Sequence, residues 1–459
     1  MNFGRPLRRP KFFLGCHSTF PHLRRLRDVR RCAVLCSLLL FTAAAAPPKQ
    51  PNILLIVLDT VRYDAVSAAN TPFLDSLAKR GVVFTAAYST HDFTPTSHFS
   101  METGLRDGLG SDDDRPENGV AWQLGRHGYS TFAAVANGLL AQSQMPVHRG
   151  YAAFQLVGDI TGVVPNNFMN DILAIDARLA LFRVRPTHYA RAMVYFSAER
   201  VLPPFLEQMR AAKRPYFGFV NLIDAHAPYV PRVRNYEPEA KVPPNFDGDV
   251  LARRLPAELA RPDSIADPER RAAIKAKIAE IGGNPRLLAL DLPPESLAIY
   301  KRRYMAKVRE TDDVLRQFFE AANREHLLDD TVVIITSDHG ESFGEGGYVT
   351  HMLRDKGDAE ATHHVPLLVV LPPRFARSAA TIDRRVSIAN LAATIYDLAG
   401  LDWSPFAQRF DGWPRSLVPL FTTVPPHIAR AVPPERSAQD LSEAERERLK
   451  AMKSLGYVH

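Results

Sequence analysis

Cysteine is nearly absent from this sequence. The 459 residues include three cysteines, Cys16, Cys32 and Cys36, and all of them lie within the first 46 positions. The remaining chain therefore has no disulfide, no thiolate metal site and no cysteine nucleophile. Long apolar segments are also missing after residue 46, so the sequence predicts no membrane-spanning helix in the main part of the chain.

Excess charge is missing from the main part of the chain as well. The whole sequence has 57 Lys and Arg against 50 Asp and Glu, a net charge of +7. Residues 1–46 hold nine of the basic side chains and one acid, Asp28, so this segment carries +8 and the rest carries −1. A nearly neutral body argues against nucleic acid as a partner. Hydrophobic residues make up 46% of the chain, which excludes wholesale disorder.

The first 48 residues have the order of a secretory signal. A basic segment ends at Arg31, an apolar run from Cys32 to Ala46 follows, and small residues at 44–46 offer a cleavage site. The apolar run is shorter than the roughly 20 residues that a membrane-spanning helix needs. We therefore expect residues 1–48 to be a signal peptide and the protein to be exported, periplasmic or extracellular. The alternative is a leader that is retained as an N-terminal membrane anchor.

Apolar runs alternate with helical patterns along residues 50–400. Continuous apolar runs are typical of strands that are covered on both faces of a parallel sheet, and they occur at Asn52–Leu58, Val82–Tyr88, Thr131–Ala136, Tyr216–Ile223, Val332–Thr336 and Pro366–Leu371. Helices are expected between them at Thr71–Arg80, Gly119–His127, Tyr304–Leu327 and Ile388–Ala399, with Gly81, Gly128 and Gly400 as C-terminal stops. The pattern predicts an α/β fold, a mostly parallel central sheet with helices on both faces.

The predicted domain organisation has three parts. Residues 1–48 form the leader, residues 50–400 form the main domain, and residues 401–459 form a small C-terminal region. Within the main domain, residues 230–300 are rich in Pro, Arg and Glu, and we expect an insertion that caps a site. The C-terminal region ends in a predicted helix over 441–455, whose Ser442 and Glu445 form a capping box.

Acidic and histidine side chains follow three of the predicted strands. They are Asp59 after the first strand, Asp224 and His226 after the strand that ends at Ile223, and Asp338 and His339 after the strand that ends at Thr336. Ligands of open α/β sheets bind beyond the carboxyl ends of the strands, so these side chains are expected to meet at one edge. Carboxylates and neutral imidazoles are ligands for divalent cations, and Asp59, Asp338 and His339 would suit Ca²⁺, Zn²⁺, Mn²⁺ or Mg²⁺.

Three later histidines could fold back onto the same edge. His351 follows a glycine-rich loop over 344–347, and His363 and His364 precede the next predicted strand. Taken alone, each of these histidines fits a loop or surface position better than a place in the site.

The segment from Thr90 to Gly104 is the other unusual stretch. Thr94 followed by Pro95 predicts a helix with Thr94 as its N-cap and proline at the first helical position, and Gly104 predicts the end of that helix. A hydroxyl at a helix N-terminus sits in a positive field that suits anions and favours an alkoxide. The simpler interpretation is a threonine that only caps the helix.

Together these segments resemble the sulfatase branch of the alkaline phosphatase superfamily, from about Asn52 to Leu420. The opening strand and Asp59 resemble its first metal ligand, and Thr71–Phe84 resembles its "T-P-x-L-D-x-L-A-x-x-G-x-x-F" segment. The strand end over 331–341 resembles its metal-binding "S-D-H-G-E" element, and residues 411–417 are similar to a late "D-G-x-S-L" element. The resemblance implies the sulfatase fold and hydrolysis of a sulfate or phosphate ester with a divalent metal ion.

One departure from the family pattern concerns the catalytic group. Ordinary sulfatases carry C-x-P-S-R, whose Cys or Ser becomes formylglycine, whereas alignment on the closing Thr103-Gly104 places Thr94 at that position and His98 at the arginine position. No formylglycine is expected here. The pattern T-x-x-S-H-x-S resembles the superfamily branch that uses an unmodified Thr nucleophile, which includes phosphodiesterases and phosphotransferases. Thr60 also replaces a second Asp that is common in formylglycine sulfatases.

The resemblance implies roles for the candidate residues. Asp59, Asp338 and His339 would hold the cation, with Thr94 both as a ligand and as the nucleophile. His226 and His351 would bind anionic oxygens or protonate the leaving group. Alternatively, Asp224, His226 and His351 would form a second metal site. His98 is expected to hydrogen-bond near the nucleophile.

The substrate class stays open between sulfate and phosphate. A threonyl phosphoester is hydrolysed by attack at phosphorus, whereas a threonyl sulfate lacks the hydrate route by which formylglycine releases sulfate, so the chemistry favours phosphorus. The expected partner is a small-molecule, glycan or lipid ester, and hydrolase and transferase activities are both compatible with the motif. A different class of function is a catalytically inactive relative that binds sulfated or phosphorylated glycans.

Overall fold

The computed structural model describes the main part of the chain. The described residues are 50–157, 168–354, 356–375, 379–410, 412 and 414–422, with the backbone alone for 168–170. Three predicted features lie outside these residues: the leader, the helix over 441–455, and two residues of the late family element, Asp411 and Trp413. In the described part, no helix combines the length and the apolar character that crossing a membrane requires.

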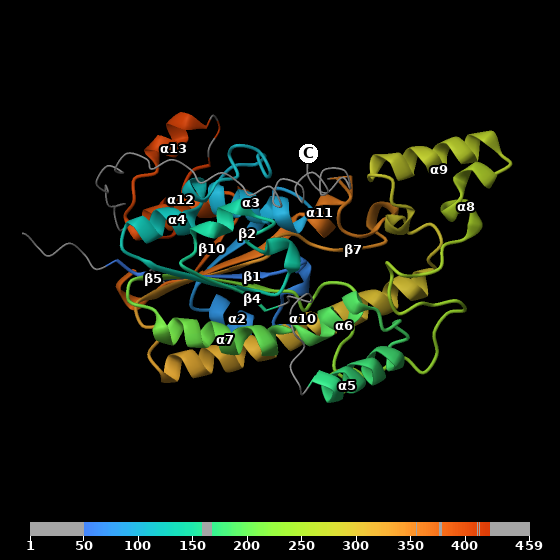
Figure 1. The fold of residues 1–459 in the computed structure, drawn as a ribbon, viewed down its shortest axis with the longest axis horizontal. Coiled ribbons are helices and arrows are strands. Elements are labelled where there is room, and N and C mark those ends of the chain that lie inside the picture. Colours follow the sequence, from blue (N-terminus) through green and yellow to red (C-terminus); the bar gives the residue numbers. More distant parts are fainter. Residues whose placement is uncertain are drawn as a thin grey trace, which may run out of the picture. The chain divides into compact units, whose positions relative to one another are not determined.

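The architecture is built on one large twisted sheet (Figure 1). Its strands are β1 (Asn52–Leu58), β2 (Val82–Tyr88), β3 (Ser130–Val135), β4 (Ala153–Leu156), β5 (Tyr216–Leu222), β6 (Thr331–Thr336), β9 (His364–Val370), β10 (Ala380–Ile382) and β11 (Val386–Ser387). The order is β10-β2-β9-β6-β1-β5-β3-β4, and β11 also pairs with β2. Neighbours are parallel, except that β9 runs antiparallel to β2 and β6. The predicted mostly parallel sheet is confirmed.

Strand β1 lies at the centre because both of its faces are apolar. Each residue of β1 is buried, with β5 on one side and β6 on the other. Ile53, Leu55 and Val57 pack into one core layer, and the alternating residues Leu54 and Ile56 pack into the other. A strand that is covered on both sides reads as a continuous apolar run, which is why its sequence does not alternate.

Helices cover both faces of the sheet (Figure 1). One face is covered by α3 (Thr94–Thr103), α4 (Val120–Arg126) and α12 (Asn390–Ala399), and the other by α2 (Pro72–Ala78), α7 (Ala198–Ala211) and α10 (Pro294–Arg324). The remaining α-helices are α5 (Phe168–Leu181), α6 (His188–Tyr195), α8 (Ala257–Ala260), α9 (Pro268–Glu280), α11 (Ala359–Thr362), α13 (Ser404–Arg409) and α14 (Val418–Phe421). The predicted fold class, with helices on both faces, is therefore confirmed.

Short elements connect these helices and strands. A small antiparallel hairpin is formed by β7 (Ser342–Phe343) and β8 (Val349–Thr350). The 3₁₀ turns are η1 (Tyr63–Ala65), η2 (Pro116–Asn118), η3 (Gly138–Leu140), η4 (Pro146–Gly150), η5 (Pro262–Ser264), η6 (Pro285–Leu287), η7 (Glu345–Gly347) and η8 (Pro373–Phe375).

Two predicted helix boundaries are wrong. The long helix α10 starts at Pro294, ten residues before the expected Tyr304, because Pro293 and Pro294 can open a helix. Helix α2 ends at Ala78, before the expected stop, and Gly81 does not have the left-handed conformation of a C-terminal cap. Gly81 instead allows a close approach, since a Cβ there would lie 2.8 Å from the carbonyl oxygen of Val369 in β9. Gly128 and Gly400 do adopt positive φ values, of 91° and 71°.

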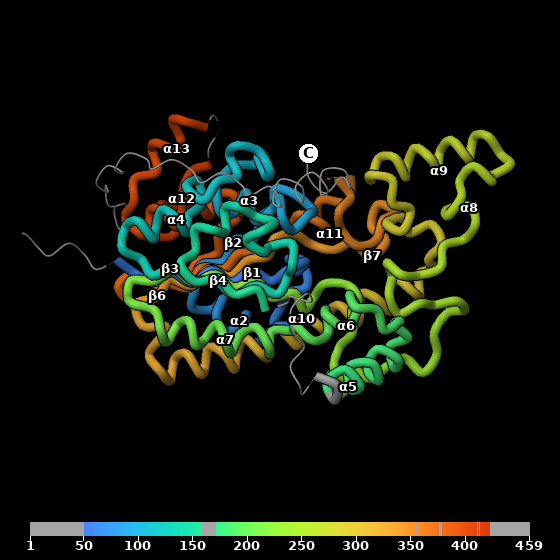
Figure 2. Tube along the Cα trace, in the orientation of Figure 1, coloured from blue at the N-terminus to red at the C-terminus, as the bar shows by residue number. Residues whose placement is uncertain are grey.

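The predicted insertion over 230–300 has a small core of its own. Helices α8 and α9 lie beyond one end of the sheet (Figure 2), and Leu259, Ile274 and Leu288 pack with Tyr348 and Leu353 of the segment that follows β7. The insertion thus contacts the stretch that carries His351. Helices α5 and α6 form another separate cluster, which packs against Val230.

Candidate active site

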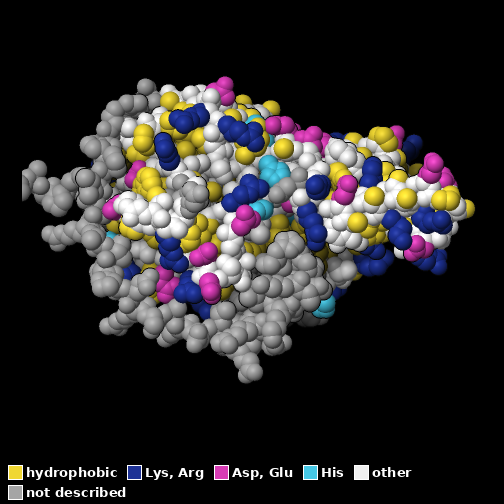
Figure 3. Space-filling model, turned by 90° about the horizontal axis from the view of Figure 1, so that it is seen from above, with side chains coloured by type: hydrophobic (Ala, Val, Ile, Leu, Met, Phe, Trp, Pro, Cys, Tyr) yellow, Lys and Arg dark blue, Asp and Glu magenta, His cyan; other side chains and the backbone are white. Residues whose placement is uncertain are grey.

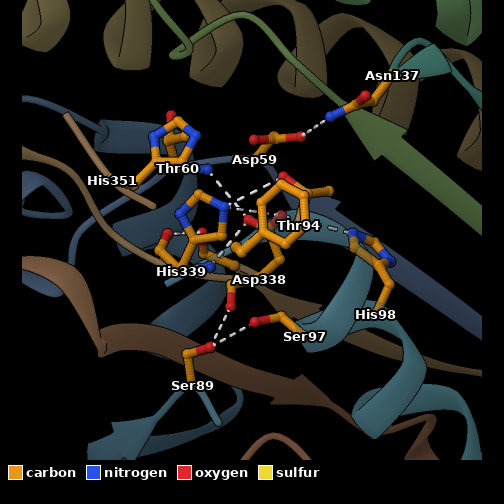
Figure 4. A network of polar contacts seen from close by, with 12 residues as sticks. Asp59, Thr60, Ser89, Thr94, Ser97, His98, Asn137, Asp338, His339 and His351 are labelled. Carbon is orange, nitrogen blue, oxygen red and sulfur yellow. Dashed lines mark hydrogen bonds and ion pairs between the residues drawn. The ribbon is translucent and has the colours of Figure 1, made fainter. Parts of the chain in front are cut away.

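Three predicted metal ligands meet at the carboxyl edge of the sheet (Figure 4). Asp59 follows β1, and Asp338 and His339 follow the neighbouring strand β6. Ligand atoms of these three residues all lie within 4.8 Å of one another, and each side chain is fully buried. Among the described residues, this is the group of three or more His, Cys, Asp or Glu side chains that has the spacing of a metal site.

The hydrogen bonds of the two carboxylates leave one oxygen of each unsatisfied. Asp59 Oδ2 accepts from the side-chain amides of Asn137 at 3.1 Å and Asn221 at 3.4 Å. Asp338 Oδ1 accepts from the backbone amides of Thr60 at 3.1 Å and His339 at 2.9 Å. Asp59 Oδ1 and Asp338 Oδ2 have no hydrogen-bond partner among the described residues. Buried carboxylate oxygens of this kind need a cation or a proton, so the pair fits a divalent metal ion.

His339 is held in the tautomer that a metal ligand requires. Its Nδ1 lies 2.9 Å from the carbonyl oxygen of Gly340, and a carbonyl only accepts, so Nδ1 carries the proton. The lone pair is therefore on Nε2, which lies 3.1 Å from Thr94 Oγ1. Fixing one ring nitrogen on a backbone carbonyl is how proteins orient histidine ligands.

Thr94 approaches the cluster from the start of helix α3. The helix begins at Thr94 with Phe93 as its N-cap, so the predicted N-cap position of Thr94 is wrong by one residue. Thr94 is 2% exposed, and its Oγ1 lies at the positive end of a helix whose end at Gly104 is confirmed by a φ of 78°. The described structure therefore brings Thr94 together with Asp59, Asp338 and His339, as the sequence predicts.

The protonation of the cluster reflects its burial. Burial raises the pKa of Asp338 to about 7, and burial together with the charge of Asp338 raises the pKa of Asp59. Burial and the neighbouring His351 lower the pKa of His339 to about 4, so its imidazole is neutral at neutral pH. Two buried carboxylates beside each other resist ionisation unless a positive charge joins them, which again suits a cation.

A strained residue helps to orient Asp338. Thr60 directly follows Asp59 and has a φ of 62°, a left-handed conformation that non-glycine residues rarely adopt. The conformation directs the backbone amide of Thr60 to Asp338, while its carbonyl accepts from the hydroxyl of Tyr304 at 3.0 Å. Backbone strain that is maintained by surrounding contacts is typical of functional sites.

Two further histidines line up beside His339. The ring centroids of His339 and His351 are 4.5 Å apart, and those of His351 and His226 are 4.8 Å apart. The predictions that His351 folds back to this edge and that His226 follows β5 into the site are thus consistent with the geometry. His351 is 2% exposed, and burial together with His226 lowers its pKa to about 3.

Both of these histidines are anchored through Nδ1. His351 Nδ1 lies 3.1 Å from Glu341 Oε1. His226 Nδ1 lies 2.9 Å from the carbonyl oxygen of Ala227 and 2.9 Å from the hydroxyl of Tyr189, which donates to the same carbonyl at 2.7 Å. These contacts orient both rings through Nδ1 and leave Nε2 as the ring nitrogen opposite the anchoring atoms.

Sequence reasoning missed four residues that support the site. Glu341 belongs to the "S-D-H-G-E" element, but the sequence suggests no role for it. Asn137 follows β3 and Asn221 lies in β5, and neither belongs to a motif. Tyr189 comes from helix α6, and no sequence signal connects it with His226. These contacts depend on how distant segments pack, which a single sequence does not reveal.

The alternative second metal site with Asp224 is wrong. Asp224 Oδ2 accepts from the backbone amide of Ala198 at 2.7 Å and so caps helix α7. Its other oxygen pairs with the buried ammonium of Lys307 at 3.3 Å. Both carboxylate oxygens are occupied by structural contacts, which leaves His226 and His351 without the third ligand that this alternative required.

In the described part of the chain, the contact expected of His98 is missing, and His363 and His364 make contacts of their own. His98 is fully buried, but the expected hydrogen bond near the nucleophile is not formed: its ring nitrogens have no hydrogen-bond partner among the described residues, and Nε2 lies 3.7 Å from Asp338 Oδ2. His364 bonds to Glu360 at 2.7 Å and stacks on Tyr63, away from the cluster. His363 Nδ1 lies 2.9 Å from the hydroxyl of Thr362.

The site reaches the surface on the histidine side. The three metal-ligand candidates are fully buried, whereas His226 is partly exposed and Tyr189 is 38% exposed. Figure 3 shows histidine side chains, together with basic and acidic ones, near the middle of one face of the molecule, without distinguishing the histidines of the site from others. The side of the cluster that carries His226 and Tyr189 is therefore its more exposed side.

Curated proteins match part of this chain. Curated relatives include an arylsulfatase K from Canis lupus familiaris, 35% identical over 117 residues, and a choline-sulfatase from Rhizobium meliloti strain 1021, 29% identical over 134 residues. The first match covers 26% of this chain and 20% of the relative, and the second covers 29% and 24%. The aligned segments thus span a quarter or less of these relatives.

Solved structures share the fold over most of the chain. A phosphonate monoester hydrolase from Silicibacter pomeroyi has a TM-score of 0.54 and 21% identity, with 81% of this chain and 77% of that chain covered. The phosphonate monoester hydrolase of Agrobacterium radiobacter has a TM-score of 0.52 and 20% identity, with 79% of each chain covered. At this level of identity, the similarity establishes the fold. The family model for Sulfatase matches residues 51–401, which is most of the chain, and we conclude that the protein belongs to the sulfatase family.

Proposed function

We propose that this protein is a metal-dependent hydrolase or transferase of phosphate or sulfate esters in which Thr94 is the nucleophile. The observation that carries the proposal is the position of Thr94 Oγ1, 3.1 Å from His339 Nε2 in a cluster that also contains Asp59 and Asp338. The unsatisfied oxygens of Asp59 and Asp338 support a divalent cation at the same place.

The cation would be held by Asp59, Asp338, His339 and Thr94. When bound, such an ion supplies Lewis-acid stabilisation of negative charge on the nucleophile and on the transferred group. The proposed ligands are carboxylate and hydroxyl oxygens and one imidazole nitrogen, and such a set suits Zn²⁺, Mn²⁺, Ca²⁺ or Mg²⁺. The chain has no cysteine after Cys36, so no formylglycine derived from cysteine takes part.

The reaction then needs two displacements at phosphorus or sulfur. The hydroxyl of Thr94 loses its proton, Oγ1 forms a bond to the central atom, and the bond to the leaving alcohol breaks as that oxygen takes up a proton. Water or a second alcohol next attacks the threonyl ester, and the bond to Oγ1 breaks, which restores Thr94. The N-terminus of α3 provides a positive field for the anionic oxygens during both steps.

His226 and His351 would transfer protons and bind anionic oxygens during the reaction. Their Nδ1 atoms are held by Ala227 and Glu341, so each Nε2 is free to accept a proton and to hydrogen-bond to an anionic oxygen afterwards. His226 lies nearer to solvent and would serve the leaving group, which must depart through the opening. His351 lies next to His339 and would serve the transferred group.

Phosphorus suits the threonine nucleophile better than sulfur. A threonyl phosphodiester is released by attack of water at phosphorus, whereas a threonyl sulfate has no hydrate route for release. Two solved structures with the same fold are phosphonate monoester hydrolases, which supports phosphorus as the reacting atom. We propose a small-molecule, glycan or lipid phosphodiester or phosphonate ester as substrate, encountered outside the cytoplasm because the first 48 residues have the pattern of an export signal.

Turnover of a bis-aryl phosphodiester and of an aryl sulfate by wild type, Thr94→Ala and Thr94→Ser tests the proposal. Thr94→Ala should lower kcat at least about 10³-fold, and Thr94→Ser should restore part of the loss. Thr96→Ala is the matched control, since this hydroxyl lies in the same helical turn and only bonds to the carbonyl of Phe93. Faster turnover of the sulfate that survives Thr94→Ala would contradict both the nucleophile and the substrate class.

A further inference from the structure

The loop that carries His351 has an unusual backbone. Thr350, Met352 and Arg354 all have positive φ values, of 64°, 65° and 53°. Residues other than glycine adopt this left-handed region rarely, and three of them at alternate positions persist only where surrounding contacts impose the conformation. His351 lies between the first two, so its place in the site depends on what holds residues 350–354.

Asp92 holds two backbone amides of this loop. The amide of Leu353 donates to Asp92 Oδ2 at 2.7 Å, and the amide of Met352 donates to the carbonyl oxygen of Asp92 at 2.9 Å. Asp92 is 2% exposed, so water does not compete freely for these contacts. The side chain of Leu353 packs into the core of the insertion, which holds the other side of the loop.

The segment around Asp92 is itself fixed to the nucleophile and to the sheet. Asp92 lies two residues before Thr94, at the entrance of helix α3. Ser97 Oγ of this helix donates to the carbonyl oxygen of His91 at 2.8 Å, and Ser89 Oγ lies 2.6 Å from the same oxygen. Ser89 Oγ also donates to the carbonyl of Asp338 (Figure 4). Asp92 thus extends from a well-anchored segment to the loop of His351.

We propose that Asp92 is a positioning residue, whose carboxylate fixes the loop over 350–354 and thereby sets His351 relative to Thr94. This inference rests on the proposed function, in which both side chains act on one substrate. Glu341 orients the imidazole ring of His351 through Nδ1, and Asp92 fixes the backbone that carries it. Two carboxylates from different segments therefore set the position and the ring orientation of His351.

A double-mutant cycle separates positioning from general stabilisation. Asp92→Ala should lower kcat about 10- to 100-fold with a smaller change in KM, because His351 loses its alignment for the chemical step. In a His351→Ala background, the same substitution should lower kcat less than about 2-fold, since no aligned histidine remains to be lost. Equal losses in the two backgrounds would overturn the inference.

Two further variants control for folding. Asp92→Asn retains an oxygen that can accept from Leu353 and should keep kcat within about 3-fold of wild type. Asp114→Ala is the matched control, because Asp114 is a buried carboxylate that accepts backbone amides of Gly110 and Val147 at 3.0 and 3.2 Å. It should lower the melting temperature without a comparable loss of kcat. A loss of kcat as large as that of Asp92→Ala would make the effect structural and overturn the inference.

Hydrogen exchange tests whether Asp92 holds the loop over 350–354, and this test does not depend on catalytic activity. Asp92→Ala, or Asp92→Ser if the alanine variant does not fold, should speed amide exchange in a peptide over 349–354 while helix α3 stays protected. If the exchange of that peptide is unchanged, Asp92 does not hold the loop, and the inference is refuted even when the enzyme is active. Conversely, if wild type hydrolyses neither ester but the Asp92 variant still shows the faster exchange, the proposed function is refuted and the role of Asp92 in the loop stands.

Discussion

The two halves of the candidate site are built in different ways. Asp59, Asp338 and His339 follow neighbouring central strands directly, and their positions are set by the register between β1 and β6. His226 and His351 sit on loops, and their rings are oriented by Tyr189 from helix α6, by Ala227 and by Glu341. The strand-end half inherits the rigidity of the sheet, whereas the loop half depends on packing between distant segments. Metal binding and proton transfer should therefore be separable by mutation.

The largest effect is expected in the strand-end half. Asp338→Asn removes one of the two carboxylates proposed to bind the cation. The metal stoichiometry should therefore fall well below that of wild type, and kcat should drop at least about 10³-fold. Elemental analysis and turnover on the same preparation measure both quantities. A variant that keeps both its metal and its activity would remove Asp338 from the ligand set and break the comparison between the two halves.

A smaller effect is expected in the loop half. His351→Ala should lower kcat by about 10²-fold, which is typical of the loss of one proton-transfer group. Its metal content should equal that of wild type, because the ligand atoms of Asp59, Asp338 and His339 remain in place. Loss of the metal in this variant would mean that the loop half also binds the cation, and the division between binding and chemistry would no longer hold.

The smallest effect concerns stability and its dependence on pH. The pKa of Asp338 is about 7 in the folded protein against 3.8 for an ordinary Asp, so without metal its contribution is stabilising at low pH and is lost as pH rises through about 7. Compared with Asp338→Asn, chelator-treated wild type should therefore lose more of its melting temperature between pH 5 and pH 8, and added Zn²⁺ or Mn²⁺ should raise the melting temperature of wild type more at pH 8.

The matching control is Asp338→Asn, in which this part of the pH dependence should disappear. A metal-induced shift that is larger at pH 5 than at pH 8 would contradict the sign, because protons and the cation compete for the same carboxylate oxygens. Scanning calorimetry or dye-based melting at the two pH values is sufficient.

The strand-end half could be predicted from the sequence because its geometry is local. A buried strand followed by Asp59, and another followed by Asp338 and His339, places the side chains at one edge once the strands are parallel. Thr94 could be located through the resemblance of its motif, although the helix starts one residue earlier than expected. The predictions of Asp59, Asp338 and His339 needed only periodicity and the residues that follow each strand.

The remaining contacts could not be predicted because they depend on long-range packing. Asp224 looked like a metal ligand, but the amide of Ala198 and the ammonium of Lys307 occupy its oxygens. The helix that begins at Ala198 was missed because Pro203 and Pro204 lie within it and obscure its helical pattern. Tyr189 approaches His226 from a helix that was not predicted. Each of these outcomes requires knowing which segments are neighbours in space.

The packing of the insertion against the loop of His351 has a consequence for how this protein can diversify. Leu288 pairs with Tyr348 and packs against Leu353, so residues beyond the sheet help to carry a histidine inside the site. Sequence drift in the insertion should therefore displace a histidine of the site even though the drifting residues lie outside it. Compensating changes should accumulate on both sides of that contact.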